Sequence, residues 1–458
     1  MKVIVCGAGQ VGFNIARYLA IEGNDVTVID VEPALIERIS ETLDVQGVVG
    51  FASHPDVLER AGARDADLVI AVTYSDEVNM VACQVAHSLF DVPTKIARVR
   101  QQTYLLPIWS ELFTRAHLPI DAIISPEIEV ARAVMRRLEI PGAFDAIPLS
   151  DGLITLIGVR CGPECPVINT PLRHLTALFP DLHIFVVGIL RNDRKIVPMG
   201  DDQMLAGDEV YFVAETRHLS RAMAAFGHEE PEARRLIIVG GGNIGLYLAQ
   251  MIEEKHRGAD VKLIDLDRKR ATFVAQMLTR TVVIHGDALD VDILTEANVQ
   301  ATETIIAVSN DDEVNILSSL LAKRFGCERS VTLINKTTYA PLIGTLGIDA
   351  VVSPRAITVS TILQHVRRGR VRSVHSLSDG FGEIIEADAM ETSTLVGPPL
   401  REAKLPDGVV VGALVRDGEV IIPHGDTVVR PNDRVVIFAA AEAVKKVEKM
   451  FSVRLEFF

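Results

Sequence analysis

The sequence is poor in aromatic residues and in cysteine. Only 5% of its 458 residues are aromatic, and the five cysteines are Cys6, Cys83, Cys161, Cys165 and Cys327. An odd, scattered set of cysteines argues against a disulfide framework and favours a reducing cytoplasm. Cys161 and Cys165 could hold a metal, but no second ligand pair lies near them in the sequence, so we expect no metal site.

Excess positive charge, long apolar runs and common catalytic signatures are also missing. The net charge is −15, and such a field repels phosphate backbones, so we expect no nucleic-acid partner. No uninterrupted apolar stretch approaches the length of about 18 residues that a membrane span needs. The twelve histidines are scattered, and H-E-x-x-H, G-x-S-x-G and the Gly-Lys-Ser/Thr ending of a P-loop are absent.

A glycine-rich loop, in contrast, follows an apolar run near the start of the chain. Gly7, Gly9 and Gly12 have the spacing G-x-G-x-x-G, and apolar residues at helical spacing come next. In dinucleotide-binding domains these glycines allow a tight turn, the approach of a pyrophosphate and close helix packing. Asp30 ends the next apolar run, where an acid binds the ribose 2′-hydroxyl, which favours NAD(H) or an adenine nucleotide over NADP.

The loop occurs twice, and so do several other motifs. Gly240, Gly242 and Gly245 repeat its spacing, and Asp265 repeats Asp30. The sequence D-E-V-N at 76–79 recurs at 312–315, and I-x-P-x-G-D at 196–201 recurs at 421–426. The chain is therefore a tandem duplication of a two-part module.

The alternation of strands and helices in each half predicts an α/β fold. Each module should hold a Rossmann-like, doubly wound parallel sheet followed by a small α+β domain. In the first half we expect strands at 2–6, 25–30, 67–73, 94–99 and 121–124. Helices are expected at 127–139 and 355–368, and the acids of the two D-E-V-N motifs should begin helices, where they suit the dipole.

These residues together resemble the TrkA family, the regulatory subunits of the bacterial Trk potassium uptake system. The motifs that carry the resemblance are "GAGQVG", "VVGFASHPDVLERAGARDADLVIAVTYSDEVNM", "ARVRQQTY" and the paired I-x-P-x-G-D segments. The resemblance covers nearly the whole chain. It implies two RCK modules, each with a nucleotide-binding N-domain and a TrkA-C domain. The expected parts are N-domain 1 at 1–125, crossover helix and TrkA-C domain 1 at 126–226, a linker at 227–233, N-domain 2 at 234–353, and crossover helix and TrkA-C domain 2 at 354–458.

The resemblance also implies the role of the chain. Members of the family are not enzymes but peripheral regulators on the inner face of the cell membrane. They bind a potassium-translocating subunit, TrkH or TrkG, as tetramers that form a ring of eight RCK modules. NAD(H), or ATP and ADP, changes the shape of the ring and so gates the pore.

The nucleotide contacts carry over to matching positions in both halves. In the first half the expected contacts are Gly7, Gly9, Gln10, Val11, Gly12, Asp30, Gly50, Phe51, Ala52, Thr73, Tyr74 and Arg98. In the second half they are Gly240, Gly242, Asn243, Ile244, Gly245, Asp265, Gly286, Asp287, Ala288, Val308 and Ser309.

The two sites are not identical. Arg98 aligns with the uncharged Leu333, and Tyr74 aligns with Asn310. Since an arginine favours a phosphate-rich ligand, we expect the two sites to differ in ligand preference or affinity.

Two other functions remain open at this point. An NAD-dependent oxidoreductase would use the same fold, because Rossmann domains serve both enzymes and sensors. A structural scaffold with empty sites is the second alternative. The duplication favours a ring-building regulator over an oxidoreductase, and the presence of both Asp30 and Asp265 argues against a scaffold.

Overall fold

The computed structural model describes residues 1–21, 23–178, 183–192, 194–339, 342, 346–366, 371–377 and 381–451. Its first sheet is parallel, with the strand order β3-β2-β1-β4-β5-β6 of a Rossmann fold. The strands are β1 (Lys2–Cys6), β2 (Asp25–Asp30), β3 (Gln46–Val49), β4 (Leu68–Ala71), β5 (Thr94–Arg98) and β6 (Ala122–Ile124). The helices between them are α1 (Gln10–Ile21), α2 (Pro33–Thr42), α3 (Pro55–Arg60) and α4 (Asp76–Phe90).

The second parallel sheet repeats this arrangement, with the order β14-β13-β12-β15-β16-β17. Its strands are β12 (Arg235–Val239), β13 (Asp260–Asp265), β14 (Val282–His285), β15 (Thr304–Ala307), β16 (Arg329–Leu333) and β17 (Ala350–Val352). Its helices are α8 (Asn243–Lys255), α9 (Arg268–Met277), α10 (Val291–Glu296) and α11 (Asp312–Arg324). The predicted strands of the first half agree with the observed ones to within one or two residues at each end.

A small antiparallel sheet follows each parallel one. The first has the order β10-β9-β11-β8-β7, and the second has the equivalent order β18-β19-β22-β20-β21. The first consists of β7 (Ala143–Leu149), β8 (Ile154–Arg160), β9 (Ile184–Arg191), β10 (Arg194–Ile196) and β11 (Glu209–Glu215), with α6 (Leu172–Leu178) and α7 (Leu219–Ala225). The second consists of β18 (Val371–Ser376), β19 (Gly382–Asp388), β20 (Val409–Arg416), β21 (Glu419–Ile421) and β22 (Arg434–Ala440), with α14 (Val444–Met450). The tandem duplication is therefore confirmed.

The core follows from the strand sequences. β1 and β4 are apolar and buried along almost their whole length, as central strands of a sheet covered on both faces must be. The two small sheets share one apolar core, in which Tyr211 and Val187 of the first lie with Phe438 of the second and with Phe381, which directly precedes β19. Gly188 leaves room for Phe381, because a Cβ there would lie 2.4 Å from a ring carbon.

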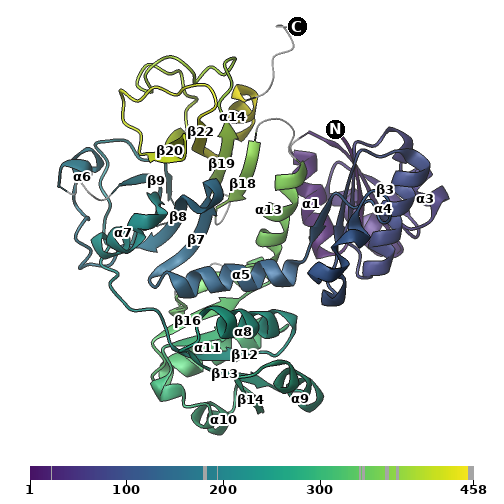
Figure 1. Ribbon diagram of the computed structural model, residues 1–458, viewed down its shortest axis with the longest axis horizontal. Helices are drawn as coiled ribbons and strands as arrows, with labels where there is room; N and C mark the ends of the chain where they lie inside the picture. The colour runs from purple at the N-terminus through teal and green to yellow at the C-terminus, as the bar shows by residue number, and fades with distance from the viewer. Residues whose placement is uncertain are drawn as a thin grey trace. The chain divides into compact units, whose positions relative to one another are not determined.

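The long helices are exchanged between the two halves. The chain forms two compact units, and the first combines Met1–Glu129 with α13 (Pro354–Val366) from the second half. Helices α13 and α1 lie side by side (Figure 1). Ile362 of α13 is fully buried in one core cluster with Ile15 and Leu19 of α1, and Arg355 donates a hydrogen bond to Asn14. In the second unit, Glu139 at the end of α5 (Pro126–Glu139) accepts a hydrogen bond from Lys255 of α8 at 3.1 Å.

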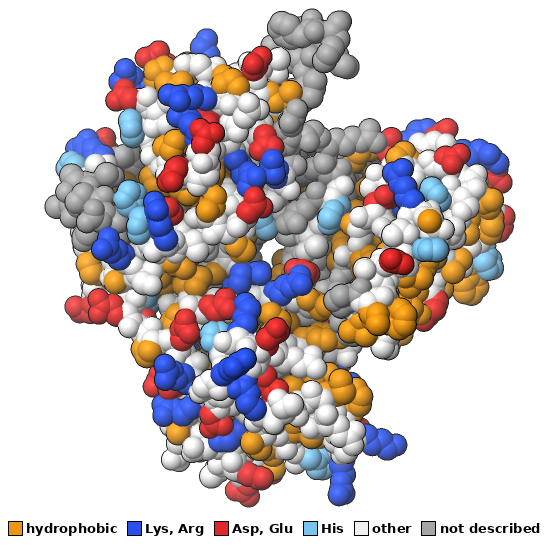
Figure 2. Space-filling model, viewed as in Figure 1, with side chains coloured by type: hydrophobic (Ala, Val, Ile, Leu, Met, Phe, Trp, Pro, Cys, Tyr) orange, Lys and Arg blue, Asp and Glu red, His pale blue; other side chains and the backbone are white. Residues whose placement is uncertain are grey.

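The surface carries both signs of charge. Acidic and basic side chains are interspersed over the face shown in Figure 2, so the net charge of −15 is not gathered in one region of that face. Among the described residues, no helix is long and apolar enough to cross a membrane.

Candidate functional site

The residues predicted as nucleotide contacts lie at the carboxyl ends of the strands in both parallel sheets. In the first sheet they follow β1, β3 and β4 or end β2 and β5, and in the second they follow β12, β14 and β15 or end β13. The sheet order reverses between β1 and β4 and between β12 and β15. Ligands of doubly wound folds bind in the crevice at such a reversal.

The three glycines of each loop have different surroundings. Gly7 and Gly240 have φ of +111° and +99°, which a residue with a Cβ adopts only under strain. A Cβ on Gly12 would lie 1.7 Å from the carbonyl oxygen of Gly7, so this glycine permits close packing of α1 on β1. A Cβ on Gly9 would meet no atom within 4 Å. The backbone at Gly9 is therefore open to a neighbouring group.

The second loop repeats these surroundings. A Cβ on Gly245 would lie 2.0 Å from the carbonyl oxygen of Gly240, and one on Gly242 would meet nothing within 4 Å. Helices α1 and α8 begin at Gln10 and Asn243, with Val11 and Ile244 next in sequence. The first N–H groups of each helix have no partner within the helix and can bind an anion.

Each loop is held by the aspartate that was predicted to bind the ribose. Asp30 Oδ2 accepts a hydrogen bond from the N–H of Ala8 at 2.6 Å, and Asp30 Oδ1 accepts one from Glu32 at 2.9 Å. Asp265 makes the same pair of bonds to Gly241 and Asp267, at 2.6 and 2.8 Å. A carboxylate oxygen can accept more than one hydrogen bond, so both carboxylates can also accept from a ribose hydroxyl.

The segments after β3 and β14 differ between the halves. Phe51 is 54% exposed, and its ring packs on His54 with a centroid distance of 5.2 Å. The neighbours Gly50 and Ala52 lie at the same edge, and Ala52 is buried. In the second half Asp287 takes the place of Phe51 and accepts a hydrogen bond from the N–H of Leu289 at 2.9 Å, between Gly286 and the buried Ala288. The first site thus offers an exposed ring where the second offers a carboxylate.

The asparagine of each D-E-V-N motif ties two strand ends together. Asn79 Oδ1 accepts from the N–H and hydroxyl of Thr73 at 2.8 and 2.7 Å, and its Nδ2 donates to the carbonyl of Arg98 at 3.0 Å. Asn315 does the same with Ser309 and Leu333, and Val308 beside Ser309 is buried. These fully buried asparagines position the ends of β4 and β5, and of β15 and β16. No sequence motif indicated this role for the two asparagines.

The aspartate of each motif accepts hydrogen bonds from backbone N–H groups of its own module. Asp76 Oδ2 accepts from the N–H groups of Arg100 and Gln101 at 2.8 and 2.7 Å. Asp312 accepts from Asn335 and Lys336 in the second half. As predicted, both acids begin helices, with Ser75 and Asp311 as the capping residues.

Tyr74 and Arg98 distinguish the first site. Tyr74 is 87% exposed, and the Arg100 guanidinium lies 4.9 Å from its ring centroid. Arg98 is mostly buried and lies 3.6 Å from Glu127. Burial lowers the pKa of Arg98, and Glu127 partly offsets this. Among the described residues, the buried Nε of Arg98 has no hydrogen-bond partner.

The second site contains an arginine that the sequence analysis missed. Arg270, in the first turn of α9, donates from Nε to the carbonyl of Gly241 at 2.6 Å and from a terminal nitrogen to Asn243 Oδ1 at 3.2 Å. It thus lies along the glycine-rich loop and places positive charge beside the expected pyrophosphate position. The register of the duplication aligns it with Leu35, so the second site has an arginine that the first lacks at this position, as Arg98 has no counterpart in the second.

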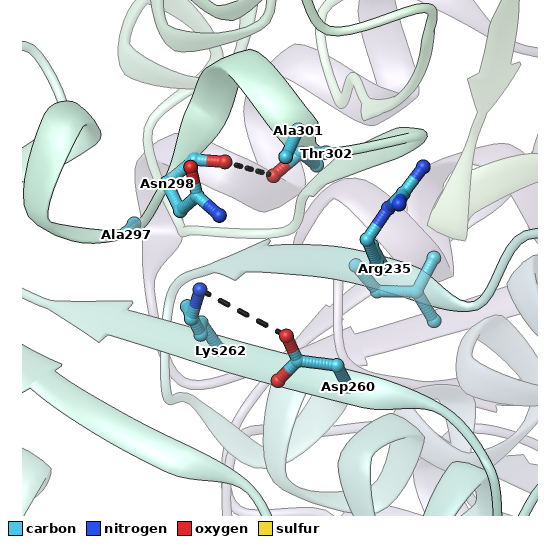
Figure 3. A pocket seen from close by; sticks show the side chains of 8 residues that line it. Arg235, Asp260, Lys262, Ala297, Asn298, Ala301 and Thr302 are labelled. Atoms are coloured by element: carbon cyan, nitrogen blue, oxygen red, sulfur yellow. Dashed lines mark hydrogen bonds and ion pairs between the residues drawn. The ribbon is translucent and has the colours of Figure 1, made fainter.

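A small polar hollow in the second sheet is separate from these crevices. Figure 3 shows its lining by Arg235 and Asp260, which begin β12 and β13, with Lys262, Asn298 and Thr302. It therefore lies near the amino ends of these strands, at the edge opposite the glycine-rich loop.

Comparison with known proteins agrees with this architecture. The TrkA-N domain family matches residues 3–126 and 236–354, and the TrkA-C domain family matches residues 156–227 and 384–452. The Trk system potassium uptake protein TrkA of Azorhizobium caulinodans is 56% identical, over 100% of both chains. The protein of the same name from Halomonas elongata is 42% identical, again over 100% of both chains.

Solved structures show the same fold at lower sequence identity. The crystal structure of the GsuK RCK domain is 19% identical with a TM-score of 0.62, covering 99% of this chain and 95% of that one. The GsuK channel bound to NAD is 18% identical with a TM-score of 0.61, covering 99% and 79%. The predicted resemblance and fold class are confirmed, and the chain belongs to the TrkA family of Trk system potassium uptake proteins.

Proposed function

We propose that this chain is a nucleotide-sensing regulatory subunit that gates a potassium-translocating membrane protein of the TrkH or TrkG type. Its role as a regulatory subunit of potassium uptake follows from relatives that are named Trk system potassium uptake protein TrkA and match along the whole chain. An NAD-dependent oxidoreductase is not favoured, because the duplicated TrkA-C domains belong to this regulatory family.

The single observation that carries nucleotide sensing is the paired loop geometry. Gly9 and Gly242 border space that nothing in the described chain fills, while Asp30 and Asp265 hold the loops beside it. These features fit a dinucleotide or an adenine nucleotide, and related folds have been solved with NAD and with ADP. NAD(H) is the proposed ligand, with ATP and ADP as further candidates.

The proposed contacts are those predicted from the sequence, with Arg270 added in the second site. When bound, the nucleotide supplies its phosphates as an anion for the helix N-termini. The proposed division of the chain is N-domain 1 at 1–125, crossover helix and TrkA-C domain 1 at 126–226, linker at 227–233, N-domain 2 at 234–353, and crossover helix and TrkA-C domain 2 at 354–458.

The proposed mechanism is allosteric. A tetramer forms a ring of eight modules on the inner face of the membrane, and nucleotide binding changes the angle between modules. The nucleotide must prefer one ring shape, because equal affinity for both would shift nothing. Coupling of about 1–3 kcal/mol per site is typical, and several sites acting together can shift an open–closed equilibrium strongly.

Potassium flux tests this proposal directly. The chain would be reconstituted with its membrane partner in liposomes, and potassium uptake would be followed with NADH, NAD, ATP or ADP added on the side that carries the regulator. We expect at least one nucleotide to change the flux only when the chain is present. Flux that depends on the chain but is unchanged by every nucleotide would contradict nucleotide gating.

A further inference from the structure

Three side chains of types that can bind a metal ion meet in the first small sheet domain. His183 directly precedes β9, Glu215 ends β11, and His218 lies just before α7. One ligand atom from each lies within 4.8 Å of the other two. The two imidazole rings are stacked, with centroids 4.9 Å apart. The cluster is remote from the glycine-rich loops in sequence, and nucleotide binding gives it no role.

The contact between His218 and Glu215 is close but is not a hydrogen bond. His218 Nδ1 lies 3.2 Å from Glu215 Oε2, yet within the described part of the chain this buried nitrogen makes no hydrogen bond. The two groups are close enough for an ion pair, and the same separation also suits a ring nitrogen and a carboxylate oxygen that share one cation. Arg217 Nε lies 2.6 Å from Glu215 Oε1 and holds the other carboxylate oxygen. Groups outside a metal site commonly orient its ligands in this way.

The second module provides an internal comparison at the same three positions. The register is fixed by a matching ion pair in each small sheet, Arg191 with Asp208 and Arg416 with Asp433. His183, Glu215 and His218 then align with Gly408, Ala440 and Ala443. A Cβ on Gly408 would lie 2.9 Å from the Cβ of Ala440 and 3.9 Å from that of Ala443. The three positions therefore lie together in both modules, but only the first module has metal-ligating side chains at them.

The backbone at His183 is unfavourable for a histidine. Its φ is +45°, in the left-handed region, and Gly408 at the equivalent position has φ of +80°. Glycine adopts this conformation readily, whereas a residue with a Cβ is strained. The first module thus has a histidine at a left-handed position where the second module has a glycine, which adopts this conformation without strain. Strained residues of this kind cluster at functional sites.

We propose that His183, Glu215 and His218 bind a transition-metal ion, with Zn²⁺ as the best match. Two histidines and one glutamate are a known zinc ligand set, and they leave one tetrahedral position for water. Ligands at about 2.0–2.1 Å from a tetrahedral zinc are roughly 3.3 Å apart, so small side-chain rotations suffice to close the site. The bound ion ties the start of β9 to the start of α7.

Zinc binding to the full chain tests the proposal. The protein would be stripped with a chelator and titrated with Zn²⁺ by calorimetry, and Co²⁺ would report the ligand type through its absorption spectrum. Two variants copy the second module, His183→Gly and His218→Ala. A third, with Cys161→Ser and Cys165→Ser together, removes a buried thiol pair that could itself bind zinc.

We expect one zinc ion per wild-type chain, bound at least ten-fold more weakly by His183→Gly and by His218→Ala and unchanged in the double serine variant. The cobalt spectrum should lack a thiolate charge-transfer band. Without metal, His183→Gly should unfold at the same temperature as wild type or higher, because the strain is relieved, and zinc should no longer raise that temperature. Equal zinc affinity in wild type and both histidine variants, loss of binding in the double serine variant, or no zinc binding by wild type at micromolar concentration would overturn the proposal.

Discussion

The carboxylate of Asp30 accepts a hydrogen bond from the backbone N–H of Ala8 at 2.6 Å, in the middle of the first glycine-rich loop. The acid that should recognise the ribose therefore also fixes the loop that should hold the pyrophosphate. Asp265 has the same relationship to Gly241. Removing either aspartate would disturb both functions at once, so a cleaner test of binding must leave these hydrogen bonds intact.

Gly9→Ala provides that test in the first site. Since no atom lies within 4 Å of the added Cβ, the free energy of unfolding should stay within about 1 kcal/mol of wild type. The methyl group would occupy the approach of the pyrophosphate, so nucleotide affinity at this site should fall at least about ten-fold, or 1.4 kcal/mol. Calorimetry and urea unfolding measure the two effects.

Two other alanine substitutions serve as controls. Gly258→Ala adds a methyl group in open space on an exposed turn and should change neither property. Gly12→Ala should destabilise the fold by about 3 kcal/mol or more, because its Cβ overlaps the carbonyl of Gly7. If Gly9→Ala binds nucleotide as tightly as wild type, the loop is not the phosphate site.

Arg270→Ala should weaken the second site selectively. A charged hydrogen bond to a phosphate contributes about 1.5–3 kcal/mol, so affinity should fall by roughly ten- to hundred-fold. Lys269→Ala removes the same charge from the exposed neighbouring position on α9 and is the matched control. Binding would be followed in the Gly9→Ala background, so that the second site is observed alone. Equal losses in the two variants would mean that only net charge matters.

Asn79→Ala should destabilise the first Rossmann domain. The substitution leaves the half-buried N–H of Thr73 and the carbonyl of Arg98 without their partner, at a cost of about 2–3 kcal/mol. Val81→Ala, on the exposed face of the same helix, should cost far less. Chemical denaturation followed by circular dichroism compares them. A loss for Asn79→Ala no larger than that for Val81→Ala would show that the asparagine does not hold the strand ends.

Much of the fold could be predicted from the sequence, because local patterns encode it. The apolar strands and the glycine spacing fix the sheets and their loops, and the duplication confirms each assignment in a second copy. The exchange of α13 onto α1 could not be predicted, since an apolar helix face does not specify which of two similar domains it covers. The burial of Ile362 against Ile15 and Leu19 is visible only in three dimensions.

Two features of the candidate sites were not predicted from the sequence. Arg270 has no spacing signal of its own, and its contact with Gly241 depends on how its side chain turns back over the loop. His183 lies far in sequence from Glu215 and His218, and it matches no metal-binding motif. Aligning the two halves position by position would have drawn attention to it, because glycine is its counterpart.

The free energy of unfolding should vary with pH in the acidic range because of Glu253. Partial burial alone would raise its pKa, but hydrogen bonds from the N–H groups of Arg280, Thr279 and Thr281 outweigh this and lower it from 4.5 to about 2. A lowered folded-state pKa contributes stability that is present above about pH 4.5 and is lost as the pH falls towards 2.

The substitution Glu253→Gln isolates this contribution. It should destabilise the second Rossmann domain near neutral pH, and its difference from wild type should shrink between pH 4.5 and pH 2. Glu254→Gln, at the exposed neighbouring position of α8, should show little difference at any pH. Urea unfolding across this range measures both, and a difference between Glu253→Gln and wild type that stays constant with pH would contradict the assignment.

The central claim is that the chain binds nucleotides as a sensor, and calorimetry on the full chain tests it most directly. NADH, NAD, ATP and ADP would be titrated separately into wild type, Gly9→Ala and Gly242→Ala, while absorbance follows the NADH. The account predicts binding at two sites per chain, each lost in its own variant, with the NADH unconsumed. Absence of binding by wild type, or steady oxidation of NADH, would contradict it.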